Sequence, residues 1–407
     1  MKYIYLFNKQ SLASASGVGT YINQIKEIIL GMNDVKLNIV NYNLGVNEFS
    51  VIHEGVVSVY NFPVNGDITL FSKERKQMRN LWYILFSYIK INETDKLIFH
   101  FNYYPDTHLV PFVKEKFPFA KTLFTIHYSD WGLLLEGNTS YFRRIIQSTP
   151  PSERKDEQNI YNLYKRDKEV FAKVDHIISL CRYTQSILEE EYRINADKIS
   201  LIPNGLKDER IILTDQERKR IRKEWNIAED EKVILFVGRL EKLKGLDELI
   251  SAFKVLHQTE PNIRLLVVGD GIASTYILQA KKHTSKISFL GRLSKEELFG
   301  LYQIADVGVL PSKNEQCSYV AIEMMMFDIP LVLSSTSGLK EMCDHAEIVE
   351  IVEKEESVYL SPEKLSKAIK KQLENPIRET RRDYEEKYTL EIMSHNMYNL
   401  YNSLFTK

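Results

Sequence analysis

The sequence predicts an α/β protein made of two domains, each with its own parallel β-sheet. Three observations support this prediction. The chain has 407 residues, which is more than a domain of ordinary size contains. Short apolar runs alternate with helical patterns along both halves, as in parallel sheets that carry helices on both faces. A polar, charged stretch at residues 205–231 separates the two halves.

The composition narrows the class of protein. Apolar residues make up 44% of the chain, and the formal net charge is −1, so we expect no nucleic-acid partner. Cys181, Cys317 and Cys343 are far apart in the sequence, which argues against a zinc site and fits a reducing compartment. The first residues lead directly into a strand pattern, and no apolar run approaches the roughly 20 residues that span a bilayer. We therefore expect a cytoplasmic protein.

The apolar runs of the first half predict strands at residues 3–8, 36–42, 56–60, 97–102, 121–127, 176–180 and 199–203. After the first of these, Gly17 and Gly19 precede a helical pattern. Glycines there let backbone N–H groups approach a phosphate at a helix N-terminus. Thr20 and Tyr21 follow, so the third glycine of a dinucleotide fingerprint is missing and NAD is disfavoured. A flexible turn is the alternative interpretation.

His100 and His127 lie at predicted strand ends, where a lone histidine is usually structural. We favour a functional role for His127, because its strand should end at the same crevice as the Gly17–Gly19 turn. Residues 128–151 follow, and we expect a long irregular segment that forms part of an acceptor pocket.

Residues 72–90 begin basic and become aromatic. A helix on a membrane surface or against a partner is one interpretation. We favour a core helix with a solvated first turn, because the basic residues do not follow one face throughout. Peripheral contact with a membrane stays open.

The second half predicts strands at residues 232–237, 263–268, 287–290, 306–310 and 331–334. Gly238, Gly269 and Gly291 follow the first three of these strands. Arg239 comes directly after Gly238 and Lys244 lies five residues further on, at the next helix start, and both side chains suit phosphate oxygens. Taken alone, this pair could be a solvated basic turn.

The fourth of these strands leads through a polar loop into a helical pattern. Glu315 and Glu323 stand eight residues apart, with Cys317, Ser318 and Tyr319 between them. Ligands of open α/β sheets bind at the carboxyl ends of the strands, where this loop lies. We expect Glu315 in the loop and Glu323 one or two turns into the helix, so that each contacts a different part of one ligand.

Together these pieces resemble the retaining, nucleotide-sugar-dependent glycosyltransferases of family 4, which have the GT-B fold. The similarity covers most of the chain, and its most specific part is the spacing of Glu315 and Glu323. It implies two Rossmann-like domains that face each other across a cleft, at residues 1–208 and 209–384. A C-terminal helix at residues 385–407 is expected to cross back and complete the first domain.

The resemblance also implies roles for single residues. Arg239 and Lys244 would hold the donor diphosphate and stabilise it as it leaves, and Glu323 would bind the ribose hydroxyls. Glu315 would contact the donor sugar near the reacting carbon, and His127 would lie near the sugar and the acceptor. The remaining implied donor contacts are Gly17, Gly19, Gly238, Gly269, Gly291, Cys317, Ser318 and Tyr319.

The sequence departs from the family pattern at some positions. Ser318 stands where the family usually has glycine, so a side chain points to where the sugar would lie, and the donor sugar stays open. His127 is followed by Tyr128, where an aspartate is common. Residues 324–327, after Glu323, are large, and we expect them to pack in the core.

The resemblance implies transfer of a sugar from a nucleoside-diphosphate sugar, first of all a UDP-sugar, to an acceptor hydroxyl with retention of configuration. No Asp-x-Asp lies at a strand end, so we expect no metal, and we expect no other cofactor. The acceptor stays open between a glycan, a lipid-linked sugar, a protein or peptide and a small molecule. A non-catalytic GT-B subunit that stabilises another glycosyltransferase, or a sugar-nucleotide epimerase, are the alternatives.

Overall fold

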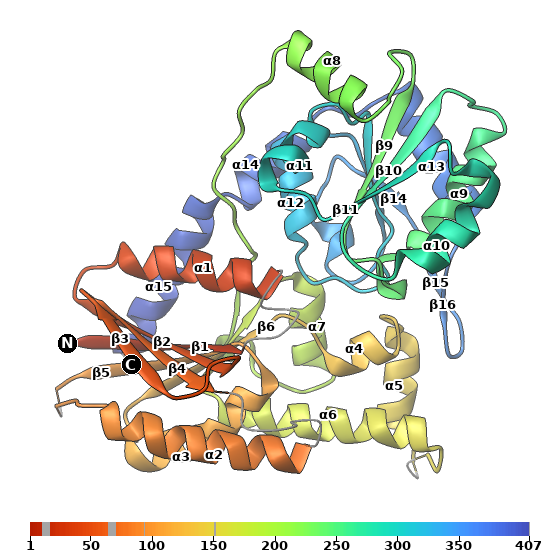
Figure 1. The fold of residues 1–407 in the computed structure, drawn as a ribbon. Helices are drawn as coiled ribbons and strands as arrows, with labels where there is room; N and C mark the ends of the chain where they lie inside the picture. The colour runs from red at the N-terminus through yellow and green to blue at the C-terminus, as the bar shows by residue number, and fades with distance from the viewer. Residues whose placement is uncertain (10–16, 64–70, 93, 150–151, 407) are drawn as a thin grey trace. The chain divides into compact units, whose positions relative to one another are not determined.

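The computed structural model describes residues 1–9, 17–63, 71–92, 94–149 and 152–406. The chain divides into two compact units (Figure 1). Unit 1 comprises Met1–His127, Tyr161–Asn204 and Leu390–Lys407, and unit 2 comprises Tyr128–Ile160 and Gly205–Thr389. The segment from Tyr128 to Ile160 therefore belongs to unit 2, although residues 1–208 were expected to form the first domain.

Within the described residues, unit 1 contains an eight-stranded sheet in the order β3-β4-β2-β1-β5-β6-β7-β8. Its strands are β1 (Lys2–Lys9), β2 (Val35–Leu44), β3 (Ser50–Glu54), β4 (Val57–Pro63), β5 (Lys96–Phe101), β6 (Lys121–Ile126), β7 (His176–Ser179) and β8 (Ile199–Leu201). All neighbouring pairs are parallel except β3 and β4, which are antiparallel. The predicted parallel sheet is confirmed. The sequence prediction missed only the edge strand β3, which is mostly exposed and so has no apolar run.

The helices of unit 1 cover both faces of this sheet, with α1 and α15 on one face and α2 and α3 on the other (Figure 1). The α-helices are α1 (Gly17–Leu30), α2 (Phe71–Tyr88), α3 (Val110–Lys116), α7 (Arg182–Glu190) and α15 (Leu390–Thr406), and most of α6 (Lys155–Lys173) also lies in this unit. Helix α15 buries Met393, Met397, Leu400 and Leu404, and the hydroxyl of its Tyr401 lies 2.8 Å from Nδ1 of the buried His100. The prediction that a C-terminal helix completes the first domain is confirmed, but this helix begins at Leu390 and not at residue 385, since residues 385–389 belong to unit 2.

Six of the described strands of unit 2 form one sheet, in the order β11-β10-β9-β12-β13-β14. The strands are β9 (Lys232–Val237), β10 (Ile263–Val268), β11 (Ile287–Gly291), β12 (Val307–Leu310), β13 (Leu331–Ser334) and β14 (Glu347–Val349). All pairs are parallel. This is the doubly wound Rossmann order, in which the direction of winding reverses between the first and fourth strands, here β9 and β12.

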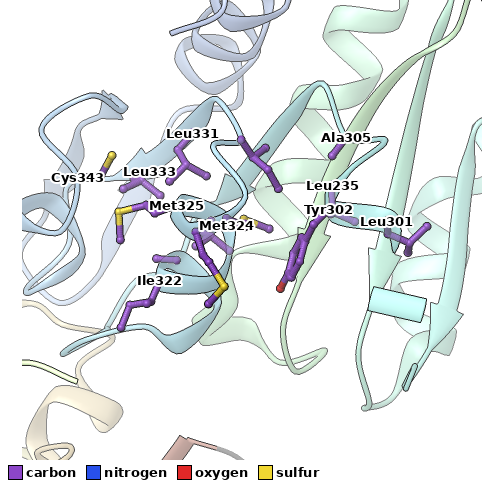
Figure 2. Packing of buried hydrophobic residues seen from close by; sticks show 14 of the residues in the cluster. Leu235, Leu301, Tyr302, Ala305, Ile322, Met324, Met325, Leu331, Leu333 and Cys343 are labelled. Atoms are coloured by element: carbon purple, nitrogen blue, oxygen red, sulfur yellow. The ribbon is translucent and has the colours of Figure 1, made fainter. Parts of the chain in front are cut away.

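Helices pack against both faces of this second sheet. The α-helices outside residues 128–160 are α8 (Asp215–Glu224), α9 (Leu246–His257), α10 (Ala273–Ala280), α11 (Lys295–Tyr302), α12 (Tyr319–Met326), α13 (Pro362–Glu374) and α14 (Thr380–Lys387). Helices α9, α10 and α13 cover one core layer, and α11, α12 and α14 cover the other. Figure 2 shows the second layer, where Met324 and Met325 of α12 pack near Leu235, Leu331 and Leu333 of the strands. The methionines after Glu323 are core residues, as predicted.

Residues 128–149 differ from the expected irregular segment. They form two short helices, α4 (Asp130–Leu134) and α5 (Thr139–Gln147). Each begins at a capping side chain, because Ser129 accepts from Gly132 N and Asn138 accepts from Tyr141 N. The Trp131 and Phe142 rings stack with centroids 3.9 Å apart. These caps were readable in the sequence as helix starts, and the prediction of irregular structure was wrong.

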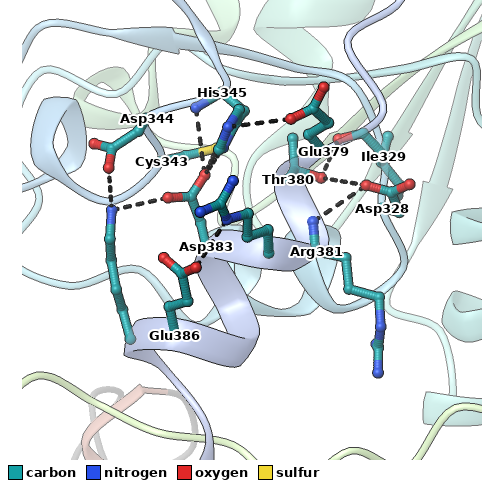
Figure 3. A network of polar contacts seen from close by, with 12 residues as sticks. Asp328, Ile329, Cys343, Asp344, His345, Glu379, Thr380, Arg381, Asp383 and Glu386 are labelled. Atoms are coloured by element: carbon teal, nitrogen blue, oxygen red, sulfur yellow. Dashed lines mark hydrogen bonds and ion pairs between the residues drawn. The ribbon is translucent and has the colours of Figure 1, made fainter.

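A polar network fixes helix α14 to the loop before β14 (Figure 3). The carboxylate of Asp383 is buried and accepts hydrogen bonds from Cys343 Sγ at 3.2 Å and Lys387 Nζ at 2.8 Å, and its Oδ2 lies 2.8 Å from His345 Nδ1. Burial alone would raise the pKa of Asp383, but these hydrogen bonds lower it to about 2. Because α14 directly precedes α15, this network holds the end of unit 2 before the chain returns to unit 1. Among the helices of the described residues, none is long and apolar enough to cross a bilayer.

Candidate functional site

The candidate site in unit 2 lies at the switch point of the sheet. Strand β9 is followed by Gly238, Arg239 and the 3₁₀ turn η3 (Lys242–Lys244), and β12 is followed by the loop that contains Glu315. Because β9 and β12 are neighbouring parallel strands, both loops leave the same edge of the sheet. This is the place where open α/β sheets bind their ligands.

Lys244 and Glu315 meet at this edge. Lys244 Nζ donates to Glu315 Oε1, which also accepts from the Ser312 hydroxyl at 3.2 Å. The backbone of Glu315 is fixed as well, because its N–H donates to Ser337 Oγ at 2.9 Å and its carbonyl accepts from Gly338 N at 2.9 Å. The two charged side chains are only 20% and 17% exposed, so they form a partly buried ion pair with one edge open to solvent.

Arg239 does not join this pair. Its guanidinium lies 2.9 Å from Glu241 Oε1 on its own loop, and its side chain is half exposed. The two cations expected to bind a diphosphate therefore each have a carboxylate partner. An incoming anion must compete with Glu241 and Glu315 for them.

Glu323 lies in the second turn of α12 and does not contact Glu315. Its Oε2 accepts a hydrogen bond from the Tyr302 hydroxyl at 2.7 Å. Burial raises the pKa of Glu323, while the Tyr302 hydrogen bond acts in the opposite direction. The predicted geometry is confirmed, since Glu315 is in the loop and Glu323 is within the helix.

Gly238, Gly269 and Gly291 form a backbone layer at the ends of three neighbouring strands. Gly238 N donates to Val268 O, and Gly269 N donates to Gly291 O at 2.8 Å. Gly269 has φ of 138°, and a Cβ there would collide with the carbonyl of Gly238, so only glycine fits. Any ligand at this edge can approach the backbone closely.

Cys317, Ser318 and Tyr319 lie at the N-terminus of α12. The Ser318 hydroxyl caps the helix by accepting from Ala321 N at 3.3 Å, and its own N–H donates to Met342 Sδ at 3.2 Å. The side chain that replaces the usual glycine is therefore engaged with its own helix. The positive end of the helix dipole remains directed at this edge of the sheet.

The expected site residues of unit 1 follow the carboxyl ends of strands β1 and β6 of the first sheet. Gly17 and Gly19 fall in the first turn of α1, and residues 10–16 of the preceding turn lie outside the described residues. His127 directly follows β6 and packs edge-on against Tyr21 with ring centroids 4.6 Å apart. Burial lowers the pKa of His127 to about 3, so its imidazole is neutral.

Asn102 determines which nitrogen of His127 carries the proton. Its amide Nδ2 donates to Phe7 O at 3.0 Å, so its Oδ1 faces His127 Nε2 at 3.1 Å and must accept from it. The proton is therefore on Nε2, and Nδ1 keeps its lone pair.

The sequence prediction missed four residues that hold the expected ones in place: Asn102, Tyr302, Ser312 and Ser337. Asn102 and Ser312 were detectable, since each is a polar residue just after a buried strand. Tyr302 and Ser337 gave no such signal, because the helix turn and the loop that contain them have no distinctive pattern.

Family comparisons agree with this arrangement. The model for glycosyl transferases group 1 matches residues 217–389, and the model for glycosyltransferase family 4 matches residues 60–210. Together the two matches cover most of the chain and support a GT-B glycosyltransferase like those of family 4. The resemblance seen in the sequence is thereby confirmed.

This GT-B glycosyltransferase is similar to curated proteins over part of their sequences and to solved structures over nearly the whole chain. An uncharacterized glycosyltransferase of Methanocaldococcus jannaschii is 37% identical over 157 residues, or 37% of this chain and 39% of that protein. The matched part thus spans about two-fifths of the curated relatives. Among solved structures, sucrose-phosphate synthase of Thermosynechococcus elongatus matches over 100% of both chains with a TM-score of 0.76 and 19% identity. Anabaena HepE in complex with UDP and glucose matches over 99% of this chain and 100% of that one, with a TM-score of 0.69 and 13% identity.

Proposed function

We propose that this glycosyltransferase moves a sugar from a nucleoside-diphosphate sugar, first of all a UDP-sugar, to an acceptor hydroxyl. The observation that carries the proposal is the Lys244–Glu315 ion pair at the switch point of the second sheet. A cation and a carboxylate at this edge match the two ends of the bond that must break, which are the diphosphate and the sugar. The Anabaena HepE complex supports UDP, because the same fold holds UDP and glucose there.

The first step of the proposed mechanism is an exchange of ion-pair partners. When the donor diphosphate arrives, Lys244 leaves Glu315 for the phosphate oxygens, and Arg239 leaves Glu241 in the same way. Glu315 is then free to contact the sugar near its reacting carbon. As the sugar–phosphate bond breaks, negative charge grows on the diphosphate, and the two fixed cations stabilise it. Removing either cation should cost about 3–4 kcal/mol in the transition state, roughly a hundredfold to a thousandfold in rate.

The nucleoside end of the donor is assigned to Glu323. Its ionised carboxylate would accept hydrogen bonds from the ribose hydroxyls while Tyr302 holds its other oxygen. The glycine layer of Gly238, Gly269 and Gly291 leaves room for the donor, and the amides of Cys317, Ser318 and Tyr319 would meet the sugar and phosphate. Gly17 and Gly19 would offer the first-turn amides of α1 to the phosphates.

Retention of configuration is proposed from the family resemblance. A double displacement would need a carboxylate nucleophile beneath the sugar, and Glu315 is the one obvious candidate. We favour front-face attack, in which the departing phosphate accepts the acceptor proton. His127 is neutral and would act near the sugar and acceptor as a hydrogen-bonding group. The two cations would do the work that a metal does in other enzymes, so we propose a reaction without metal or other cofactor.

We also propose a cytoplasmic location with peripheral contact to anionic membranes through α2. In the described part of this helix, Arg75, Lys76, Arg79 and the 60%-exposed Tyr83 lie on one side, opposite the buried Met78, Leu81, Trp82 and Leu85. The favoured interpretation of a core helix holds for the buried side of α2, and the membrane contact is proposed for its exposed side alone. Each basic residue near an anionic surface contributes about 1 kcal/mol of attraction, which salt screens.

Vesicle flotation tests this contact. The chain should float with phosphatidylglycerol vesicles at low salt and not with phosphatidylcholine vesicles. Replacement of Arg75, Lys76 and Arg79 by glutamine should abolish flotation. Unchanged flotation of that variant would disprove a role for α2.

Hydrolysis of a panel of nucleotide sugars tests the proposed activity, because water can replace an unidentified acceptor. We expect one donor to be cleaved, Glu315→Ala to lose this cleavage, and the same variant to keep nucleotide binding. Release of an altered sugar nucleotide instead would indicate an epimerase. If no UDP or GDP binds, the chain is better described as a non-catalytic subunit. The acceptor remains to be chosen between a glycan, a lipid-linked sugar, a protein or peptide and a small molecule.

A further inference from the structure

Lys313, two residues before Glu315, is an almost fully buried cation. Its side chain is 5% exposed, and its Nζ lies 3.1 Å from Glu136 Oε2 and 3.0 Å from Glu248 Oε1. Burial alone would lower the pKa of Lys313, but the hydrogen bonds and charges of Glu248 and Glu136 raise it. The ammonium group is therefore charged, and two carboxylates compensate it.

Glu136 differs from Glu248 because it binds a second lysine. Its other oxygen, Oε1, accepts from Lys242 Nζ. Lys242 opens the turn that ends in Lys244, and Lys313 lies in the loop that leads to Glu315. One carboxylate thus links the two loops on either side of the switch point.

The backbone at Glu136 and Gly137 adopts a left-handed conformation that places Glu136 between the two loops. Glu136 has φ of 51° and Gly137 has φ of 81°, both in the left-handed region. A Cβ at position 137 would collide with the carbonyl of Lys313, so the chain passes directly over the loop. The linked loops also touch each other, since Lys313 N donates to Leu243 O at 2.8 Å.

The segment that contains Glu136 is anchored independently of Lys313. Asn138 Nδ2 donates to Lys354 O at 2.8 Å, and the N–H groups of Thr139 and Ser140 donate to the two carboxylate oxygens of Glu353 at 3.0 and 2.9 Å. Residues 351–360 contain the antiparallel hairpin of β15 (Ile351–Glu353) and β16 (Val358–Leu360). Glu136 therefore projects from a fixed base.

We propose that Glu136 is a positioning residue of the donor site. Its carboxylate sets the separation of the loops that contain Lys244 and Glu315, so that the diphosphate and the sugar of one donor reach both. This inference rests on the proposed function. It assigns residues 128–149, which the sequence linked to the acceptor, to the donor side of the reaction.

A purely structural role for these ion pairs predicts different behaviour. Glu136→Gln leaves Lys313 compensated by Glu248, and Glu248→Gln leaves it compensated by Glu136. Each variant removes one of the two carboxylate charges beside the same buried lysine, so the two should lower the free energy of unfolding by similar amounts. Glu136→Gln removes the carboxylate that bonds both Lys242 and Lys313, whereas Glu248 bonds Lys313 alone, which makes Glu248→Gln the matched control.

The experiment compares nucleotide diphosphate and monophosphate binding in the full chain by calorimetry, with UDP and UMP or with GDP and GMP. In Glu136→Gln the preference for the diphosphate should fall about tenfold or more, and donor hydrolysis should fall at least as far, since small misplacements of catalytic groups cost up to a hundredfold. Glu248→Gln should keep both within about twofold. Lys242→Met, which removes an exposed side chain, should reproduce part of the loss and add nothing to Glu136→Gln.

Two outcomes would overturn the inference. Equal changes in Glu136→Gln and Glu248→Gln would mean that the ion pairs only stabilise the fold. If neither Glu136→Gln nor Lys242→Met changes nucleotide binding or donor hydrolysis, the loops keep their positions without the link. If Glu136→Gln does not fold, Lys242→Met alone decides this question. If the wild-type chain binds neither UDP nor GDP, the proposed function itself fails, which is a distinct result.

Discussion

Glu323 and Tyr302 form a pair in which a partly buried carboxylate depends on one hydroxyl. Burial raises the pKa of Glu323, and the 2.7 Å hydrogen bond from Tyr302 opposes that rise. If Glu323 binds ribose hydroxyls as proposed, it must be ionised to accept them. The affinity for nucleotide is therefore lost on acidification as Glu323 takes up a proton.

Tyr302→Phe should weaken UDP or GDP binding roughly tenfold, because a hydrogen bond to a charged group contributes about 1.5–3 kcal/mol. The loss on acidification should also begin at a higher pH than in the wild type, since the pKa of Glu323 rises further. Calorimetric titration across a pH series measures both effects. Tyr384→Phe, which removes a hydroxyl bonded to Leu206 O in the same unit, should leave the pH dependence unchanged. An unchanged profile in Tyr302→Phe would contradict the role of Glu323.

Asn102 controls the protonation of His127, as Tyr302 does that of Glu323. It fixes the proton on Nε2 of a neutral ring, so Asn102→Ala should free the tautomer and reduce donor turnover about tenfold to a hundredfold. Nucleotide affinity should stay within about twofold, because the proposed nucleotide contacts lie mainly in unit 2. Single-turnover kinetics beside calorimetry separates the two quantities. A loss of affinity without a loss of turnover would remove His127 from the proposed reaction.

Helix α14 depends on one buried charge. Asp383 has a pKa lowered to about 2, so it contributes stability above pH of about 4 and loses that contribution as the pH falls toward 2. Asp383→Asn should destabilise unit 2 by roughly 2 kcal/mol at neutral pH, and the difference from wild type should shrink in acid. Urea unfolding at neutral pH and at about pH 3 measures this. A difference that grows in acid would show that other groups dominate.

The elements differ in how well the sequence predicts them, for physical reasons. The central strands of both sheets are buried on both faces, so their apolar runs stand out, as in β9 and β10. Strand β3 is exposed at an edge and had no such run. Helices α4 and α5 are short, and their packing on unit 2 depends on contacts with residues far along the chain, such as Asn138 with Lys354.

The site was predictable where spacing alone defines it. Glu315, Arg239 and Lys244 lie in loops that follow strand ends, Glu323 lies in the helix after one of these loops, and the Rossmann order brings the strand ends together. Which carboxylate pairs with which cation could not be predicted, because Glu241, Glu315 and Glu136 compete for four cations through side-chain geometry.

At the level of the whole chain, α15 belongs to unit 1 although it follows unit 2 in sequence. It buries Met397, Leu400 and Tyr401, and Tyr401 is bonded to the buried His100. A chain that ends at Thr389 should therefore lose unit 1 and keep unit 2, and limited proteolysis should leave a resistant fragment from unit 2 alone. Tyr401→Phe should be milder, costing about 1–3 kcal/mol, since it leaves one nitrogen of His100 without its partner. Protection of both units in the truncated chain would contradict this.

The central claim is that the cation of the Lys244–Glu315 pair receives the diphosphate of a nucleotide sugar. Calorimetric titration of the wild type and of Lys244→Met with UDP and UMP, or with GDP and GMP, tests it most directly. We predict that the wild type prefers the diphosphate and that Lys244→Met weakens diphosphate binding roughly tenfold to a hundredfold while changing monophosphate binding far less. Equal diphosphate affinity in both proteins would contradict the account.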